Sequence, residues 1–381
     1  MRARQANPFK PTAGANPPLL VGRDDVLTEL SDALDDGPGA PGRLTLITGQ
    51  RGAGKTVMLN AAEQLAADRQ WVVISETATH GLVARLVQAA MRIAENLGHE
   101  QDRGRRLTGV SVVGLGSISL AERPGGPPPL REALEVVTDA TVRHGTGLLI
   151  TLDEIQGAER AEMRELATTI QHLLRADAEI ALVMAGLPAA SNDLLNDDVL
   201  TFLRRADRVV LGDVPLDDVR QALAATFSAA GRQVDPRALD MATAATNGYP
   251  FLIQLVGYHL WSRSRGASTI TSTHAREGIE VARRKLGSTV HAASLAPLSD
   301  VDRTYLLAMA RDEGPSRTAH VARRMRVSAG YASVYRERLI AAQMIEPAGY
   351  GRVQFALPYL RDYLREHVAH TELGARLADD E

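Results

Sequence analysis

Residues 47–56 read ITGQRGAGKT, in which four residues separate Gly49 from the run Gly54, Lys55 and Thr56. The glycines allow the backbone to fold tightly and to turn its N–H groups toward one centre. The positive end of a following helix adds to such an anion site. A lysine here reaches the β- and γ-phosphates of a nucleotide, and the threonine hydroxyl can hold Mg²⁺. The stretch is therefore predicted to be a nucleotide-binding P-loop.

The flanking residues favour this interpretation over a structural Gly-rich turn. Residues 44–47 form an apolar run that suits a buried strand, and residues 56–67 carry apolar side chains at helical spacing. The predicted nucleotide contacts of the loop are Gly49, Gln50, Arg51, Gly52, Ala53, Gly54, Lys55, Thr56 and Val57.

A second motif, LLITLDEIQ at 148–156, ends an apolar strand in Asp153 and Glu154. Acids at the carboxyl end of a parallel strand face the crevice where such sheets bind ligands. We expect Asp153, with Thr56, to serve the Mg²⁺ ion, and Glu154 to act as the general base that orients the attacking water. The alternative is that the two acids only begin the next helix, where negative charge is favourable.

The elements that would position these residues alternate along the chain. Strands are expected at 44–47, 71–75, 148–152, 180–184 and 209–211, and helices at 24–34, 56–67, 82–97, 130–143 and 158–175. Such alternation predicts an α/β fold, a parallel sheet covered on both faces. Residues 99–129 are expected to be an irregular insertion with one or two short strands and a solvated basic cluster, Arg103, Arg105 and Arg106. From 217 to 286 only helical patterns are found.

The composition limits the possible classes. The chain has 381 residues, a formal net charge of −3 and no cysteine. The net charge gives no overall attraction to nucleic acid or to a membrane surface. Without cysteine, the chain can form neither disulfides nor thiolate metal sites. The histidines show no metal-ligand spacing, no secretory signal begins the chain, and no apolar run has the length of a membrane span. A cytoplasmic protein without a membrane partner is expected.

Taken together, these motifs resemble an AAA+-type P-loop ATPase of the Orc/Cdc6-like initiator and archaeal-ATPase group, with features of the STAND signalling NTPases. The resemblance rests on the segment 21–23, the loop 49–56, the acid pair 153–154, the helical region after 214 and the C-terminal domain. It implies ATP and Mg²⁺ as ligands, hydrolysis of ATP, and Gly22 and Arg23 beside the adenine.

Some positions depart from the AAA+ pattern. The place of the polar sensor residue after the fourth core strand reads MAGLP, with Ala185 and Gly186, so the sensor is either absent or supplied by Asn192. The lid lacks the second-sensor arginine. Its turn Gly248-Tyr249-Pro250 resembles a STAND motif that packs on the nucleotide, which makes Tyr249 and Pro250 candidate contacts. The alternative is a simple helix start, because proline suits the first turn.

Arginines before the last strand match the place from which AAA+ oligomers extend a finger into a neighbouring site. Arg204 and Arg205, and also Arg208, are the candidates, and ordinary surface arginines are the alternative. A finger neutralises charge that develops in phosphoryl transfer. A homo-oligomer is the partner that this role implies.

The C-terminal segment predicts a winged helix. Helices are expected at 301–311, 317–325 and 329–342, with Ser328 capping the third, and strands at 344–346 and 353–357. The segment is rich in arginine, and a helix-turn-helix places its recognition helix in the major groove of duplex DNA. Candidate DNA contacts are Ser333, Arg336 and Arg338 on that helix and Arg352 on the wing, with Tyr331 and Tyr335 in the core. The alternative is a protein-binding or lid-like winged helix.

The expected organisation is an extended arm at 1–20, an ATPase core at 21–213, a helical lid at 214–292, a winged-helix domain at 293–370 and a tail at 371–381. The favoured function is Mg²⁺-dependent ATP hydrolysis coupled to duplex DNA binding. One alternative is a STAND-type nucleotide-gated switch with slow hydrolysis and protein partners, and another is a transcription regulator that only senses ATP.

Overall fold

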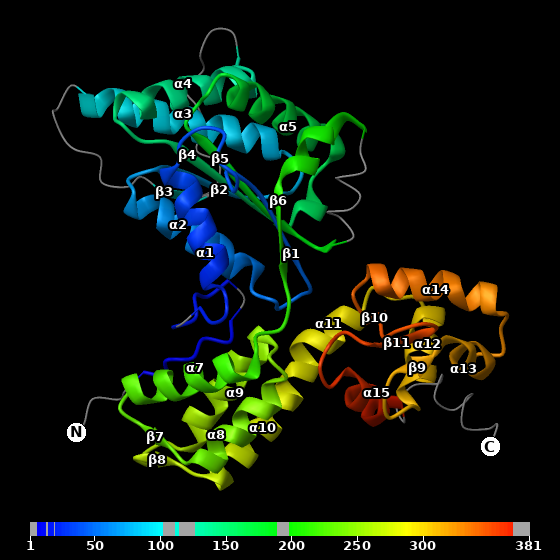
Figure 1. The fold of residues 1–381 in the computed structure, drawn as a ribbon. Helices are drawn as coiled ribbons and strands as arrows, with labels where there is room; N and C mark the ends of the chain where they lie inside the picture. Colours follow the sequence, from blue (N-terminus) through cyan, green and yellow to red (C-terminus); the bar gives the residue numbers. More distant parts are fainter. Residues whose placement is uncertain are drawn as a thin grey trace. The chain divides into compact units, whose positions relative to one another are not determined.

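The computed structural model describes residues 6–12, 14–18, 20–101, 111–113, 126–188 and 198–368. The chain divides into two compact units, one from Thr12 to Gly212 and one that joins the residues up to Pro11 to the chain from Asp213 onward (Figure 1). The arginine cluster 103–106, Asn192 and the tail 371–381 lie outside the described residues.

The first unit contains a parallel sheet, as the alternation of strands and helices predicted. Its described strands run in the order β3-β2-β4-β5-β1-β6. Their bounds are β1 Leu44–Gly49, β2 Val72–Thr77, β3 Ser111–Val113, β4 Leu148–Asp153, β5 Ile180–Gly186 and β6 Asp207–Leu211. β3 comes from the segment expected to be an irregular insertion, and it pairs in parallel with β2. The strand therefore extends the sheet at its edge.

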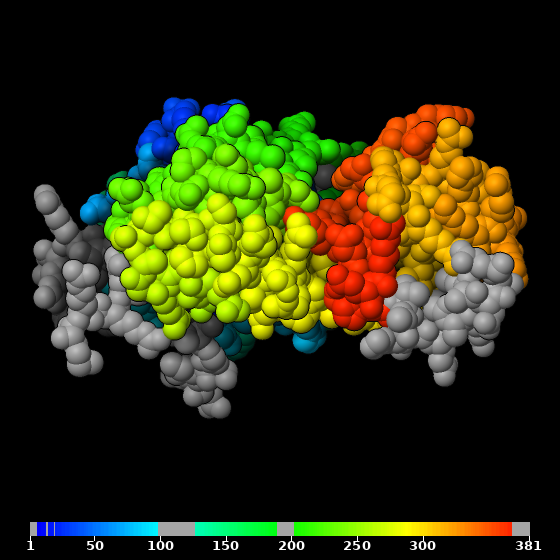
Figure 2. All heavy atoms as spheres, turned by 90° about the horizontal axis from the view of Figure 1, so that it is seen from below, coloured from blue at the N-terminus to red at the C-terminus, as the bar shows by residue number. Residues whose placement is uncertain are grey.

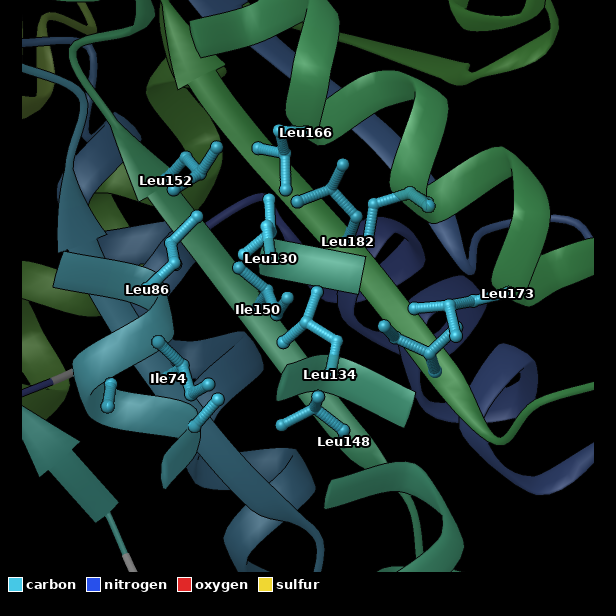
Figure 3. Close-up of a cluster of buried hydrophobic side chains, with 14 of the residues drawn as sticks. Ile74, Leu86, Leu130, Leu134, Leu148, Ile150, Leu152, Leu166, Leu173 and Leu182 are labelled. Atoms are coloured by element: carbon cyan, nitrogen blue, oxygen red, sulfur yellow. The ribbon is translucent and has the colours of Figure 1, made fainter. Parts of the chain in front are cut away.

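Helices cover both faces of this sheet. α1 and α2 pack on one face, and α3, α4 and α5 pack on the other. The bounds are α1 Asp24–Asp35, α2 Lys55–Asp68, α3 Leu82–Gln101, α4 Leu130–Arg143 and α5 Arg160–Arg175, with the short turns η1 Ile155–Gly157 and η2 Asp198–Arg205. Figure 3 shows the cluster beneath α3, α4 and α5, where residues such as Ile150 and Leu134 are fully buried. Burying a leucine or isoleucine side chain stabilises the fold by about 1.5–3 kcal/mol, so this three-layer arrangement holds the strand ends firmly.

The second unit begins with a helical region. Its helices are α7 Leu216–Ala229, α8 Pro236–Thr246, α9 Pro250–Arg263 and α10 Ser272–Leu286. They pack into one mass, seen in yellow-green and yellow in Figure 2. Two strands of two residues each, β7 Gln233–Val234 and β8 Thr269–Ile270, form a parallel pair that the sequence analysis did not foresee. Strands this short carry no readable periodicity.

Part of the N-terminal arm belongs to this helical region. Phe9 is buried, and its ring centroid lies 4.8 Å from that of Phe227. A side chain at Gly257 would meet the Phe9 ring at 2.3 Å. Glycine at 257 therefore makes the room in which Phe9 packs.

The C-terminal domain contains three helices followed by a β-hairpin, in the expected order. Its elements are η3 Gly287–His291, α11 Ala292–Leu295, α12 Asp300–Ala310, β9 Ser316–Arg317, α13 Thr318–Arg324, α14 Ala329–Ala341, β10 Ile345–Pro347, β11 Arg352–Phe355 and α15 Leu360–Val368. The strands form an antiparallel sheet in the order β10-β11-β9. β9 and α15 were not predicted. Ser328 caps α14 as expected, since its Oγ accepts a hydrogen bond of 3.2 Å from the Tyr331 N–H.

α15 joins this domain to the helical region. The Tyr359 hydroxyl, just before α15, donates to the Ala245 carbonyl at 2.9 Å and lies 3.1 Å from Arg283 Nη2. Figure 2 shows α15 in red between the yellow helices and the orange remainder of the domain.

Candidate functional site

The P-loop and the acid pair meet at the carboxyl ends of parallel strands. β1 ends at Gly49 and β4 ends at Asp153, and the two strands share the neighbour β5. The Thr56 hydroxyl, at the start of α2, donates to Asp153 Oδ2 at 2.6 Å. Two side chains separated by 97 positions are thus brought within hydrogen-bond distance. Their oxygens are of the kind that Mg²⁺ prefers.

The loop itself has the backbone of an anion cradle. Gly52 and Gly54 have φ angles of 76° and 95°, which favour glycine. A side chain at Gly49 would approach the Leu211 carbonyl oxygen to 2.9 Å. Within the described residues, the N–H groups of Gly52 and Gly54 have no protein acceptor. The donor set therefore fits a phosphate group, which needs several converging N–H groups.

Lys55 points back into this loop. Its side chain is 6% exposed, and its ammonium donates to the carbonyls of Gly49 and Gln50 at 2.9 and 3.1 Å. Burial lowers the pKa of Lys55, while the charges of Glu154 and Asp153 oppose that shift. A positive charge held beside free N–H donors is the arrangement that a polyphosphate requires.

Glu63 ties α2 to the strands and was missed by sequence reasoning. Its Oε1 accepts from the Ser75 hydroxyl at 2.7 Å and from the Thr151 hydroxyl at 2.5 Å. Thr151 is two residues before Asp153, so both side chains lie on the face of β4 that α2 covers. The sequence did contain a signal for this contact: Thr151 and Asp153 alternate along β4, and Glu63 follows Thr56 by two helical turns on α2. The contact fixes the register of α2 on β4.

Glu154 follows β4 in a left-handed conformation, with φ 56° and ψ 46°. Its N–H donates to Asp153 Oδ1 at 2.8 Å, and its carboxylate accepts from the Gln156 side-chain amide. A non-glycine residue with such angles costs free energy and is often found at functional sites. Gln156 was not selected from the sequence, although it lies in the same motif.

The remaining predicted contacts in the first unit are placed as follows. Gly22 has a φ of 63°, and Arg23 Nη2 donates to the Gly212 carbonyl at 2.5 Å, just beyond β6. Within the loop Ala53 is buried, Val57 is half-buried and Arg51 is exposed. The entry segment is therefore anchored at the β1–β6 side of the sheet, and its contact with adenine stays a prediction.

The candidate finger arginines lie at the edge of the sheet. Arg204 and Arg205 end η2, and Arg208 lies on β6, the edge strand beside β1. All three are exposed, as is Val210, at 74%. Asn192, the alternative sensor residue, is outside the described residues.

Tyr249 and Pro250 belong to the second unit. Gly248, with a φ of 76°, packs so closely on Val214 that a side chain would approach the Val214 carbonyl oxygen to 2.3 Å. Tyr249 is 1% exposed, and burial raises the pKa of its hydroxyl. Pro250 is the first residue of α9, as a helix-start proline should be. The role of this turn toward nucleotide stays a prediction.

The predicted DNA contacts differ in their surroundings. Ser333 is half-buried on α14. Arg338 donates at 3.1 Å to Oδ2 of Asp302, whose side chain is 3% exposed, and Arg336 pairs with its exposed neighbour Glu337. Arg352 instead lies directly opposite Arg317 in the β9–β11 pairing. Both are exposed, and neither makes an ion pair within the described residues.

The expectation that Tyr331 and Tyr335 are core residues is wrong for Tyr331. Its side chain is 45% exposed, and Tyr335 is half-buried. Their ring centroids lie 5.0 Å apart on the surface of α14. Helical spacing placed them on one face, but α12 and α13 cover the opposite face of α14, where Ala332 and Leu339 are buried.

The structure also brings together one group of potential metal ligands that the sequence spacing did not indicate. The ligand atoms of His80, Glu159 and Glu162 lie within 4.8 Å of one another. Glu162 already accepts from the N–H groups of Gly81 and Val83, both at 3.1 Å, and so caps α3. His80 pairs with Glu159 at 2.6 Å, which raises the pKa of that histidine. These contacts account for the cluster as local structure.

Two parts of the chain match known protein-family models. Residues 19–184 match the AAA ATPase domain, and residues 288–364 match a domain of unknown function. No protein of curated function matches the sequence. Within the described residues, none of the helices combines the length and the apolar character needed to cross a membrane.

Solved structures resemble the chain over nearly its whole length. A Walker-type ATPase of Pyrococcus abyssi matches with a TM-score of 0.66 at 16% identity, over 91% of this chain and 96% of its own. The ORC2 protein of Aeropyrum pernix, solved in ADPNP-ADP complexes, matches with 0.63 at 14% identity, over 97% and 98%. Cdc6p of Pyrobaculum aerophilum gives 0.50 at 14% identity, over 97% of each chain. At these identities the likeness establishes the fold.

Proposed function

We propose that the protein binds ATP with Mg²⁺ and hydrolyses it at the P-loop, and the match of residues 19–184 to the AAA ATPase domain supports this. The observation that carries the proposal is the hydrogen bond of 2.6 Å between Thr56 Oγ1 and Asp153 Oδ2, with Lys55 in the loop and Glu154 beside it. Phosphoryl transfer needs a metal ligand, a phosphate-binding cation and a base close together, and the proximity of these residues supports the proposal.

Each residue has a defined task. The loop N–H groups and Lys55 bind the β- and γ-phosphates, and the oxygens of Thr56 and Asp153 hold Mg²⁺. The ion, when bound, neutralises charge on the phosphate oxygens. Glu154 accepts a proton from water as the water oxygen bonds to the γ-phosphorus and the bond to the β-phosphate oxygen breaks, which leaves ADP and phosphate. Gly22 and Arg23 are the candidates on the adenine side, and Tyr249 and Pro250 are the candidate contacts from the helical region.

A second protomer would supply an arginine. Arg204, Arg205 and Arg208 are exposed at the β6 edge of the sheet, where a neighbouring copy has access. An arginine finger given in trans is worth about 10³–10⁵ in turnover in known cases. Turnover per protomer that rises with protein concentration is the expected sign of this homo-oligomer.

The C-terminal domain is proposed to be a winged helix that binds duplex DNA. Support comes from the order of its elements and from the arginines on α14, β9 and β11. Ser333, Arg336 and Arg338 are the candidates on the recognition helix, and Arg352 with Arg317 is the candidate pair at the wing. Arginines that face each other across strands repel, so a phosphate group between them would be stabilising.

The test is ATP turnover by wild type and by Glu154→Gln, with and without duplex DNA, over a range of protein concentrations. We expect turnover that requires Mg²⁺, is stimulated by DNA and is lost in Glu154→Gln while ATP binding persists. Tight ATP binding with negligible turnover that ignores DNA would contradict the proposal and support a nucleotide-gated switch.

A further inference from the structure

The end of β5 has no side chain that can reach the Glu154 carboxylate. This strand ends in Ala185 and Gly186, next to β4 in the sheet. A side chain at Gly186 would come within 2.4 Å of Ile155 Cγ1 and 3.1 Å of Gln156 Oε1. The space beside β5 is therefore filled by residues of η1, the turn that follows Glu154.

Two close contacts fix η1 in this place. On the β5 side, Ile155 is buried against Gly186. On the β2 side, a side chain at Gly157 would approach the Ala78 carbonyl oxygen to 2.6 Å. Gly157 allows η1 to approach the segment that follows β2, and Gly186 leaves room for Ile155 beside the end of β5. The residue between them, Gln156, has little freedom to shift along the backbone.

The Gln156 amide joins two groups at this edge of the sheet. Its Nε2 donates to Glu154 Oε2, and its Oε1 accepts from the Leu187 N–H at 3.2 Å. Leu187 is the residue directly after β5. One planar amide therefore links the carboxylate after β4 to the backbone that leaves β5.

From this geometry we infer that Gln156 is a positioning residue that holds the Glu154 carboxylate in the orientation for water activation. The inference rests on the proposed ATP hydrolysis. In place of a polar side chain at the end of β5, η1 supplies the polar group beside Glu154, and Gly186 leaves the space that η1 occupies.

The physical reason lies in the freedom of a glutamate side chain. Glu154 is exposed, so its carboxylate would otherwise sample several rotamers. A donor on Oε2 fixes one oxygen and leaves Oε1 to accept a hydrogen bond from water. Misplacing a catalytic group by about 1 Å costs about 10²-fold in rate. Loss of Gln156 should therefore lower kcat and leave nucleotide affinity unchanged, because the amide touches neither the loop nor Lys55.

The test compares wild type with Gln156→Met, which keeps the length of the side chain and removes both hydrogen bonds. Gln156→Glu keeps an acceptor for the Leu187 N–H and removes the donor to Glu154. We expect both to lower kcat about 10- to 100-fold at constant affinity for a non-hydrolysable ATP analogue. Gln64→Met is the matched control, since Gln64 is exposed on α2 and bonds only Asp68 in the described structure, and it should turn over like wild type.

Single-turnover rates complete the test. Gln156→Met should cause no further loss in a Glu154→Gln background, because the amide acts through that carboxylate. Wild-type kcat in Gln156→Met, a parallel loss of analogue binding, or an equal loss in the Glu154→Gln background would each overturn the inference. Wild-type protein without turnover would overturn the proposed function and the inference together.

Discussion

The nucleotide site and the basic surface of the C-terminal domain were both predicted from side-chain type and position, but their side chains behave differently. At the proposed nucleotide site, Thr56 Oγ1 and Asp153 Oδ2 lie 2.6 Å apart, as the motifs predict. On the C-terminal domain, Arg338 and Arg336 form ion pairs with Asp302 and Glu337, whereas Arg352 and Arg317 face each other and make no ion pair within the described residues. A short loop with fixed spacing dictates its own geometry, whereas an arginine on a helix takes its partners from whatever packs beside it.

The largest effect is expected on ATP turnover, when residues of the proposed nucleotide site are replaced. Lys55→Ala and Glu154→Gln should each lower ATP turnover about 10²–10⁴-fold, because one loses a phosphate contact and the other the general base. Analogue binding separates them, since Lys55→Ala should lose affinity and Glu154→Gln should keep it. Equal binding by both variants would contradict the role given to Lys55.

The next effect tests where the C-terminal domain contacts DNA. Replacing Arg317 and Arg352 together by glutamine should weaken duplex binding about 10- to 100-fold and reduce the salt slope of log K by about two. Fluorescence anisotropy against salt concentration measures both. Arg336→Gln is the comparison, because its charge is already met by Glu337. A larger loss in Arg336→Gln would place the main contact on α14.

Acid should weaken the second unit through His291. This side chain is 1% exposed, its Nε2 lies 2.9 Å from the Pro358 carbonyl oxygen, and burial lowers its pKa to about 4. Unfolded histidine binds a proton below about pH 6.5, so between that pH and about 4 the unfolded state holds the extra proton and stability falls as pH falls. At pH 5 the loss is about 2 kcal/mol.

Hydrogen exchange of α10 and α12 at pH 7.5 and 5 measures this loss. His291→Phe keeps a ring beside Tyr363 and removes the titrating group, so its stability should depend less on pH than that of wild type. His367→Phe, at an exposed histidine of the same domain, is the control and should follow wild type. Identical pH dependence in His291→Phe and wild type would contradict the assignment.

The last comparison distinguishes an arginine that stabilises the domain from one that contacts DNA. Arg338→Ala should destabilise the C-terminal domain by about 1–3 kcal/mol, because Asp302, whose side chain is 3% exposed, loses its cation. Arg336→Ala breaks a pair whose acid is exposed and should cost less than about 0.5 kcal/mol. Urea denaturation compares the two variants. Equal costs would show that the Arg338–Asp302 pair contributes no more than a surface pair.

The sequence by itself determined the elements of the fold and the residues of the proposed nucleotide site. The strands that end at Gly49 and Asp153 are apolar runs, and the helices between them show regular spacing, so the parallel sheet followed from the pattern. Gly49, Gly54, Lys55 and Thr56 act within one loop, which local spacing describes completely. Asp153 and Glu154 needed only the rule that parallel strands end at one edge.

The tertiary structure alone decided the contacts between distant segments. It brought Phe9 onto Gly257, placed Glu63 under Thr151, and set Arg352 against Arg317 across a strand that was too short to predict. It also exposed Tyr331, because only the packing of α12 and α13 defines the buried face of α14. Periodicity reports that a side chain lies on a face of an element, but which face is covered depends on neighbours that are remote in sequence.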